Sequence, residues 1–161
     1  MADIFLEIKG ANEIKGDSVA VGYEEQIDCM SWSWGASQPA NMHSATGGAA
    51  GGSMVQDISV TKNMDTASPN LMKFCCAGIH MDEVVMTCVK SGEDRQKWLQ
   101  ITMKKVIISS ISSSGQEGSA GMESLSLNFA EYEMKYWPQE AGGAEGASID
   151  AAYHIAEKHI I

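Results

Sequence analysis

The chain has 161 residues, 44% of them hydrophobic, a length and composition that fit a single domain (1–161) with a substantial core. Its 11 basic and 21 acidic residues give a net charge of −10, which disfavours nucleic acids and anionic membranes as partners. No run of about 18 apolar residues could span a bilayer, and MADIFLEIKG at the start lacks a basic leader followed by an apolar run. We therefore expect a protein that stays in the cytoplasm or leaves it by a route that reads the folded state.

The four cysteines do not predict a disulfide framework or a zinc site. Two of them are adjacent, and none is in a C-x-x-C spacing. Without a visible leader, the expected compartment is a reducing one. We interpret all four as small hydrophobic residues, namely Cys29, Cys75, Cys76 and Cys88.

The first segments of the chain predict β-strands. Residues 3–10 alternate as a strand does, and a polar turn region (11–22) follows them. Residues 24–38, EEQIDCMSWSWGASQ, alternate throughout and predict one half-buried strand. On this pattern one side carries Ile27, Cys29, Ser31 and Ser33, and the other carries Asp28, Met30, Trp32 and Trp34.

Residues 37–53 differ from these segments because they contain four glycines and show no periodicity. They predict a long flexible loop on the surface, longer than a compact domain usually tolerates without a use for it. Alternation returns in 54–62, which predicts another strand.

A short helix is expected next. Ser68 followed by Pro69 is typical of a helix start, since proline has no N–H to lose in the first turn. An apolar stripe with helical spacing follows, formed by Leu71, Phe74, Cys75 and Gly78.

Three more strands are predicted in the second half, at 82–91, 97–114 and 123–139. A glycine-rich link (141–146) and a tail (147–161) end the chain, and the pattern of the tail is weak. The fold class is therefore mainly β, α+β in strict terms: a small barrel or sandwich with one helix over an open side.

Candidate catalytic groups are few. His80, Asp82 and Glu83 resemble a metal cluster, but a helix-to-strand junction is polar for structural reasons as well. Glu131 and Glu133 share a strand face about 7 Å apart, a separation that could suit the paired carboxylates of glycoside hydrolases, but solvated strand-end charges also explain them and are the interpretation we favour. No nucleophile elbow, H-E-x-x-H pair or Walker loop is present. We expect no enzyme activity and no cofactor.

Several strands instead pair a bulky side with a side of short uncharged residues. An ordinary exposed sheet face carries Lys, Glu and Arg. Small polar residues suit a wet surface that another protein approaches closely, although a Ser/Thr-rich exterior is the simpler interpretation. The residues concerned are Ser31, Ser33, Ser109, Ser110, Ser124, Ser126 and Asn128.

These stretches resemble the Hcp family, the haemolysin-coregulated proteins that form the inner tube of bacterial type VI secretion systems. The likeness lies in IFLEIKG, IDCMSWSWGASQ, the Gly-rich loop, VQDISVTKNMDTASPNLMKFCCAG, LQITMKKVIISS and SLNFAEYEMKYWPQ, in the family's order and spacing. It covers nearly all of residues 3–139, and the tail after Ala141 is less typical.

The resemblance implies a compact β-barrel of two sheets with a short flanking helix. It also implies homohexameric rings that stack into a tube fired by a sheath, with small effectors bound and protected inside the ring. Sheath, spike and effector proteins are then partners, and the protein is secreted from the bacterial cytoplasm without a signal peptide.

Carried onto this sequence, the resemblance places Ser33 and Ser31 on the effector-facing lumen wall, with Trp32 and Trp34 in the barrel core or its seam. Ring stacking is assigned to the Gly-rich loop, through Ser37, Gln38, Asn41, Gly47, Gly48, Gly51 and Gly52.

Two other functions stay open at this point. One is a monomeric ligand-binding β-module of the sugar-binding type, with the tryptophans exposed as stacking platforms. The other is a small hydrolase that uses Glu131 and Glu133.

Overall fold

The computed structural model describes residues 2–42, 49–50, 53–92, 95–139 and 146–161. These contain one helix and thirteen strands in a mainly β arrangement, which confirms the predicted fold class. The elements are β1 (Ala2–Lys9), β2 (Ile27–Cys29), β3 (Ser31–Ser33), β4 (Ala36–Ser37), β5 (Ala40–Asn41), β6 (Ala49–Ala50), β7 (Met54–Val55), β8 (Ile58–Asn63), α1 (Ser68–Ala77), β9 (Met81–Lys90), β10 (Lys97–Ser114), β11 (Met122–Tyr136), β12 (Ile149–His154) and β13 (His159–Ile160).

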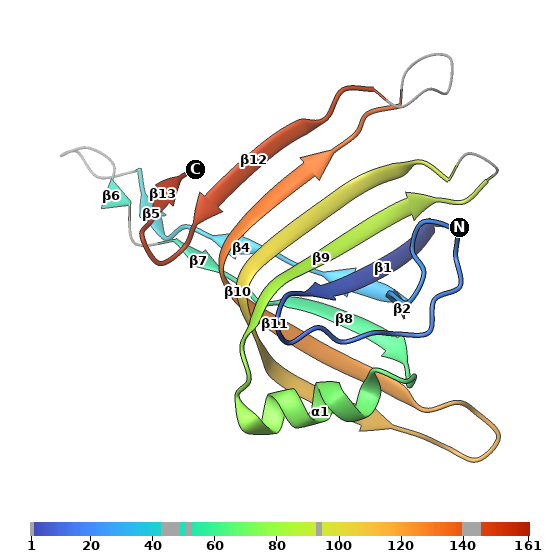
Figure 1. The fold of residues 1–161 in the computed structure, drawn as a ribbon. Helices are drawn as coiled ribbons and strands as arrows, with labels where there is room; N and C mark the ends of the chain where they lie inside the picture. The colour runs from blue at the N-terminus through green and yellow to red at the C-terminus, as the bar shows by residue number, and fades with distance from the viewer. Residues whose placement is uncertain (1, 43–48, 51–52, 93–94, 140–145) are drawn as a thin grey trace.

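Nine of the described strands form one continuous sheet that folds over, so that two parts of it, called here the larger sheet and the second sheet, face each other across the core (Figure 1). In the larger sheet the order is β13-β12-β11-β10-β9-β1-β2, and every described pairing is antiparallel. β8 pairs with β11 on one side and with β3 on the other, which makes a second sheet of β10, β11, β8 and β3.

The long strands β10 and β11 belong to both sheets. β11 pairs with β8 through residues 122–127 and with β12 through residues 131–136. β10 pairs with β9 only as far as Val106, opposite Met81. Lys105 has a left-handed φ of 54°, and the buried side chains on either side of it, Met103 and Val106, are three residues apart. The strand therefore changes its inward face here and passes from one sheet to the other.

The tryptophan segment also passes from the larger sheet to the second sheet, at the opposite side of the barrel. Here one sequence prediction is wrong. Residues 24–38 are not one strand with one alternation. β2 pairs with β1, β3 pairs with β8, and the exposed Met30 lies between them and donates its N–H to the Thr61 carbonyl at 2.7 Å. Ile27 and Cys29 face the core before Met30, whereas Trp32 and Trp34 face it afterwards. One non-alternating residue is enough to exchange the two faces.

The predicted loop 37–53 contains more structure than its composition indicated. β4 pairs with β7, and β5 pairs with β6, so the described parts of this segment and its flanks form an extended two-stranded arm. In Figure 1 the arm projects from the end of the barrel near β13. Pairing with a returning chain satisfies backbone groups that a structureless loop would leave to water.

Helix α1 lies where a helix was predicted and packs against β10. It begins at Ser68 and has proline in its first turn. Ser68 does not act as the capping residue, because Ala67 occupies the cap position and the Ser68 hydroxyl binds Glu123 instead, at 2.9 Å. Leu71 and Phe74 are the apolar residues of the helix that are buried.

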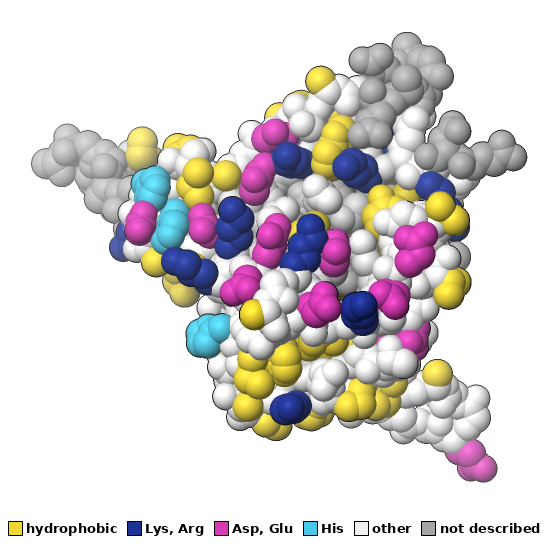
Figure 2. Space-filling view, in the orientation of Figure 1, with side chains coloured by type: hydrophobic (Ala, Val, Ile, Leu, Met, Phe, Trp, Pro, Cys, Tyr) yellow, Lys and Arg dark blue, Asp and Glu magenta, His cyan; other side chains and the backbone are white. Residues whose placement is uncertain are grey.

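The outer face of the larger sheet is strongly charged (Figure 2). Cross-strand neighbours in β1, β9, β10 and β11 form a row whose charges alternate in sign, which favours the sheet because opposite charges lie side by side. In order, the row contains Lys9, Glu83, Lys104 and Glu131, and His154 of β12 lies next to Glu131.

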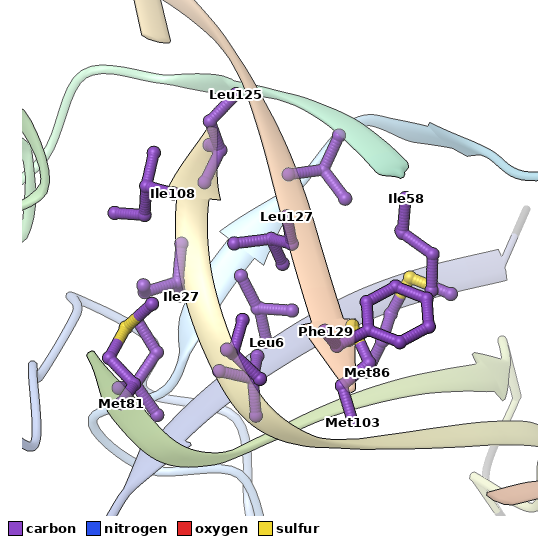
Figure 3. Close-up of a cluster of buried hydrophobic side chains, with 14 of the residues drawn as sticks. Leu6, Ile27, Ile58, Met81, Met86, Met103, Ile108, Leu125, Leu127 and Phe129 are labelled. Carbon is purple, nitrogen blue, oxygen red and sulfur yellow. The ribbon is translucent and has the colours of Figure 1, made fainter. Parts of the chain in front are cut away.

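The inner faces of the two sheets supply the hydrophobic core (Figure 3). Leu6, Ile58, Met86 and Leu127 come from four different strands, and none of them is exposed at all. Each such side chain removed from water stabilises the fold by about 1.5–3 kcal/mol before the cost of ordering it. The core therefore joins both sheets and holds the outer faces at fixed positions.

Candidate functional site

The outer face of the second sheet carries hydroxyl groups in two rows that cross four strands. We call this surface the hydroxyl face, and we call the charged outer face of the larger sheet the charged face. The strand registers define both. Its first row contains Ser33, Ser59, Ser126 and Ser110. Its second row contains Ser31, Thr61, Ser124 and Ser112. These residues are exposed or half-buried, whereas the residues that alternate with them, such as Val60 and Leu125, are buried.

Side chains on the hydroxyl face bind one another. Ser31 and Thr61 share a short hydroxyl–hydroxyl hydrogen bond, and the hydroxyls of Ser110 and Ser126 lie 2.7 Å apart. These contacts use part of each hydroxyl's capacity and leave acceptor lone pairs toward the outside. The face is therefore polar without bearing long flexible side chains.

At one end of the face, Asp57 is held by two neighbours. Ser109 donates its hydroxyl to this carboxylate at 2.5 Å, and Asn128 donates its amide N–H at 2.8 Å. Ser109 lies at the β-bulge where the register between β10 and β11 shifts. The bulge re-aims the serine toward Asp57, so that the carboxylate is bound rather than left pointing away from the sheet.

The small polar residues that the sequence singled out lie in the two rows of this face or beside them. Ser31, Ser33, Ser110, Ser124 and Ser126 belong to the two rows, and Ser109 and Asn128 lie beside them. Sequence reasoning missed Ser59, Thr61 and Ser112. The signal was present, because Ser59 and Thr61 alternate with Ile58 and Val60 as Ser31 and Ser33 do with the tryptophans.

The tryptophans lie behind the hydroxyl face, in the positions expected of core or seam residues. Both pack against the core cluster, and Trp34 donates its ring N–H to the Gln56 carbonyl at 2.9 Å. The Trp34 ring meets the Tyr132 ring edge-on, with centroids 4.8 Å apart. Packing of this kind counts against exposed stacking platforms for sugars.

A buried ion pair also lies behind the hydroxyl face. The Lys62 ammonium is fully buried and contacts Glu123 at 2.7 Å and Asp65 at 3.0 Å. Ser68 at the start of α1 donates its hydroxyl to Glu123. The pair thus joins β8, β11 and the helix. It also explains how Lys62, the one lysine of β8, can point inward.

Two thiols next to this region are poor nucleophiles. Burial is the main cause that raises the pKa of Cys29 to about 12 and that of Cys88 to about 11. A thiol with so high a pKa is protonated at neutral pH and reacts slowly. The structure thus agrees with the interpretation of both as small hydrophobic residues.

The other candidate chemistry does not assemble. Among the described residues, no group of three or more His, Cys, Asp and Glu side chains is placed to hold a metal ion, and His80 with Asp82 and Glu83 is no exception. Asp82 instead accepts the Ala11 N–H at 3.1 Å. Glu133 forms an ion pair with Lys135 at 3.3 Å, and Glu131 lies opposite Lys104 in the charged row. In the same described part of the chain, no helix is long and apolar enough to cross a membrane.

The residues assigned to ring stacking lie on the arm as far as they are described. Ser37 is in β4 opposite Met54, Asn41 is in β5 opposite Ala49, and Gln38 is exposed between them. The remaining assigned residues lie outside the described ranges: Gly47, Gly48, Gly51 and Gly52.

Comparison with known proteins identifies the class to which this fold belongs. The family model described as "Type VI secretion system effector, Hcp" matches residues 5–136. Protein Hcp1 of Pseudomonas aeruginosa is 39% identical over 158 residues, which cover 96% of this chain and 96% of the relative. The chain therefore belongs to the Hcp family, which consists of structural tube proteins of the type VI secretion system and not of enzymes.

Solved structures agree with this assignment. Hcp1 from Salmonella typhimurium superposes with a TM-score of 0.82 at 28% identity, over 99% of each chain. A type VI secretion system protein superposes with a TM-score of 0.92 over the whole of both chains, and at 22% identity it supports the fold alone. The family is one of secreted proteins, so secretion follows from membership.

Proposed function

We propose that six copies of this chain close into a ring whose lumen is lined by the hydroxyl face, and that such rings stack into the inner tube of a type VI secretion system. The chain acts as one Hcp-like domain over residues 1–161 and is expelled from the bacterial cytoplasm with the tube. Its partners are further copies of itself, the sheath and spike, and small effectors carried in the lumen. The observation that carries the proposal is the hydroxyl face and the two strand edges that bound it.

The two edges differ in sequence, as a head-to-tail ring requires. Within the described strands, β3 pairs only with β8, and residues 107–114 of β10 pair only with β11. The four-stranded sheet therefore has free N–H and C=O groups along β3 on one side and along β10 on the other. Such edges can pair with another chain, and two different edges generate a closed ring when the rotation between subunits permits.

The hydroxyl face suits a lumen wall better than an outer surface. Its short side chains let a cargo protein approach the sheet, and their hydroxyls can donate or accept according to what the cargo offers. Because no long charged side chain stands in the two rows, the wall favours no single cargo charge. We assign effector contact first to Ser33 and second to Ser31, and ring-to-ring contact to the arm that includes Ser37, Gln38 and Asn41.

Native mass spectrometry tests the ring. The expected species has about six times the 17.3 kDa mass of one chain. A strictly monomeric protein at micromolar concentration would sink the proposal.

A matched pair of arginine variants then tests the lumen. Ser33→Arg introduces a large charge on the hydroxyl face, whereas Thr102→Arg introduces the same group at a half-buried position on the charged face. We expect both variants to form rings and only Ser33→Arg to lose retention of a co-expressed effector, measured by co-purification. Equal retention by both variants would mean that effectors do not contact this face.

A further inference from the structure

Two surfaces lie toward opposite ends of the strands of the larger sheet. One is an apolar turn formed by residues 19–21, beside Asp3 at the start of β1. The other is a groove of about 790 Å³ on β9, β10 and β11, which includes Asp82 and Lys104 and lies near the level of Lys9 at the end of β1. Asp3 and Lys9 are six residues apart on an extended strand, which is roughly 20 Å. A translation along the strands, together with a shift across them from β1 to β10, brings the turn of one copy toward the groove of the next.

The turn holds its apolar side chains in the solvent. Val19 is 90% exposed and Val21 is 82% exposed. Single exposed valines need no explanation, but two on one turn form a protruding apolar tip. We call residues 19–21 the valine tip.

The valine tip is rigidly built rather than loose. The Tyr23 N–H bonds to the Ala20 carbonyl at 2.9 Å and closes a β-turn, in which Gly22 has the positive φ of 86° that its third position needs. The Gly22 N–H bonds to the Glu24 side chain at 3.1 Å. The Tyr23 ring stacks on the buried Phe5 ring with centroids 4.5 Å apart. A preorganised tip loses little entropy when it docks.

The groove has an apolar floor and a basic rim. Ile107, Phe129 and Ile155 contribute apolar surface from β10, β11 and the turn after β12. Lys104 and Lys105 are exposed at its edge, and neither forms an ion pair within the described part of the chain. The groove also contains Asp82 and Glu131. Asp82 is bound to the Ala11 N–H, and Glu131 faces Lys104 and His154 across the sheet.

The surroundings of the tip carry the opposite charge. Asp3 and Asp28 line the shallow depression beside it, with Arg95. The pKa of Asp28 is raised by burial and by the nearby negative charges of Asp3, Asp65 and Asp17, as expected of a locally negative surface. Arg95 lies 4.0 Å from Asp3, which leaves Asp28 as the acidic neighbour of the tip without an ion pair among the described residues. An apolar tip with this acidic neighbour is complementary to the side of the apolar groove that carries Lys104 and Lys105.

We propose that the valine tip of one copy docks in the groove at Lys104, Lys105 and Ile155 of a second copy, and that this head-to-tail contact joins successive rings. The inference rests on the proposed function for its ring but assigns a contact of its own. Because tip and groove are different surfaces at opposite ends of the strands, the contact does not close on itself and repeats along the tube.

Site-specific photo-crosslinking tests the contact. The photoreactive residue p-benzoylphenylalanine replaces Val21, and in a control it replaces Met72, an exposed hydrophobic residue on helix α1. Mixed ¹⁵N-labelled and unlabelled full-length chains distinguish links between copies from links within one. We expect links from position 21 to peptides containing Lys105 or Ile155 of another copy, in samples that native mass spectrometry shows to be rings.

Charge reversal adds a second readout. Lys105→Glu should lower the yield of this crosslink at least about fivefold, since it places like charges across the contact. Lys73→Glu, an exposed lysine on α1, should leave the yield unchanged.

The outcomes separate the two proposals. Rings that give no crosslink above the Met72 control, or crosslinks from position 21 to other surfaces, overturn the docking of the tip and leave the ring standing. A crosslink that Lys105→Glu does not weaken overturns the assigned groove. A parent chain that is only monomeric overturns the proposed function and, with it, this contact.

Discussion

The two outer faces of this barrel are both polar, but different kinds of side chain make them so. The face of the larger sheet is covered by charges of alternating sign, as in the row from Lys9 to Glu131. The hydroxyl face is covered by serines and one threonine, and its nearby carboxylate Asp57 is bound by Ser109 and Asn128. Interspersed charges keep a surface in water, whereas short hydroxyls allow another surface to come close. The difference supports a covered or enclosed role for the hydroxyl face.

Strand β8 shows the contrast within six residues. An ordinary half-buried strand turns its lysine outward and keeps small residues for crowded positions. Here Ser59 and Thr61 point outward, and Lys62 is fully buried against Glu123. The one charged residue of β8, Lys62, therefore lies in the core behind the hydroxyl face and not on that face.

Removing the buried charge should have the largest effect. Lys62→Met leaves Glu123, which is 2% exposed, without its cation, and should lower the free energy of unfolding by about 3–5 kcal/mol. Urea unfolding followed by tryptophan fluorescence, at one fixed protein concentration, measures this. The double variant Lys62→Met/Glu123→Leu is the control and should recover most of the loss. A single variant as stable as the parent would show that the pair contributes nothing.

Thiol labelling tests the exchange of faces at Met30. Because the pKa of Cys29 is raised to about 12, its thiolate fraction at pH 8 is on the order of 10³-fold below that of an ordinary thiol. We expect Ser33→Cys to react with iodoacetamide that much faster than Cys29 in the same chain, as resolved by peptide mass spectrometry. The rate at Cys29 should rise about tenfold per pH unit. Equal rates at both positions would place Cys29 and Ser33 on one face.

Salt dependence should distinguish the two faces directly. Lys104→Ala removes a charge opposite Glu83 and Glu131 and should cost about 0.2–1 kcal/mol at low salt and less at high salt. Ser126→Ala on the hydroxyl face should show a small effect that does not change with salt. Thermal unfolding at two salt concentrations measures both. The comparison of faces fails if Ser126→Ala is the more salt-sensitive variant.

The smallest effect is expected at Asp28. Its pKa is raised by burial and by Asp3, Asp65 and Asp17, so its charged form opposes folding at neutral pH. Asp28→Asn should therefore raise the melting temperature slightly at pH 7. The gain should shrink as the pH falls through the raised folded-state pKa and vanish below the unfolded value of about 3.9. A variant that is less stable at pH 7 would contradict this sign.

Local patterns predicted much of the hydroxyl face. Alternation around Trp32 and Trp34 correctly indicated that Ser31 and Ser33 face away from the core. The same rule failed for Met30, because a period of two holds only while a strand keeps one partner. Ser59 and Thr61 show the same alternation as Ser31 and Ser33, but alternation alone does not show which strands are neighbours. Only the register of β8 between β3 and β11 places them in the rows.

The sequence by itself determined the class of fold, the helix at Ser68–Ala77 and the family, because each depends on residue order along the chain. The tertiary structure decided that hydroxyls from four strands meet on one face, that Lys62 is buried and that the arm is paired. It also set the valine tip beside the start of β1 and the groove on β9, β10 and β11, toward the other end of the strands. All of these depend on contacts between distant segments, which a local period does not specify.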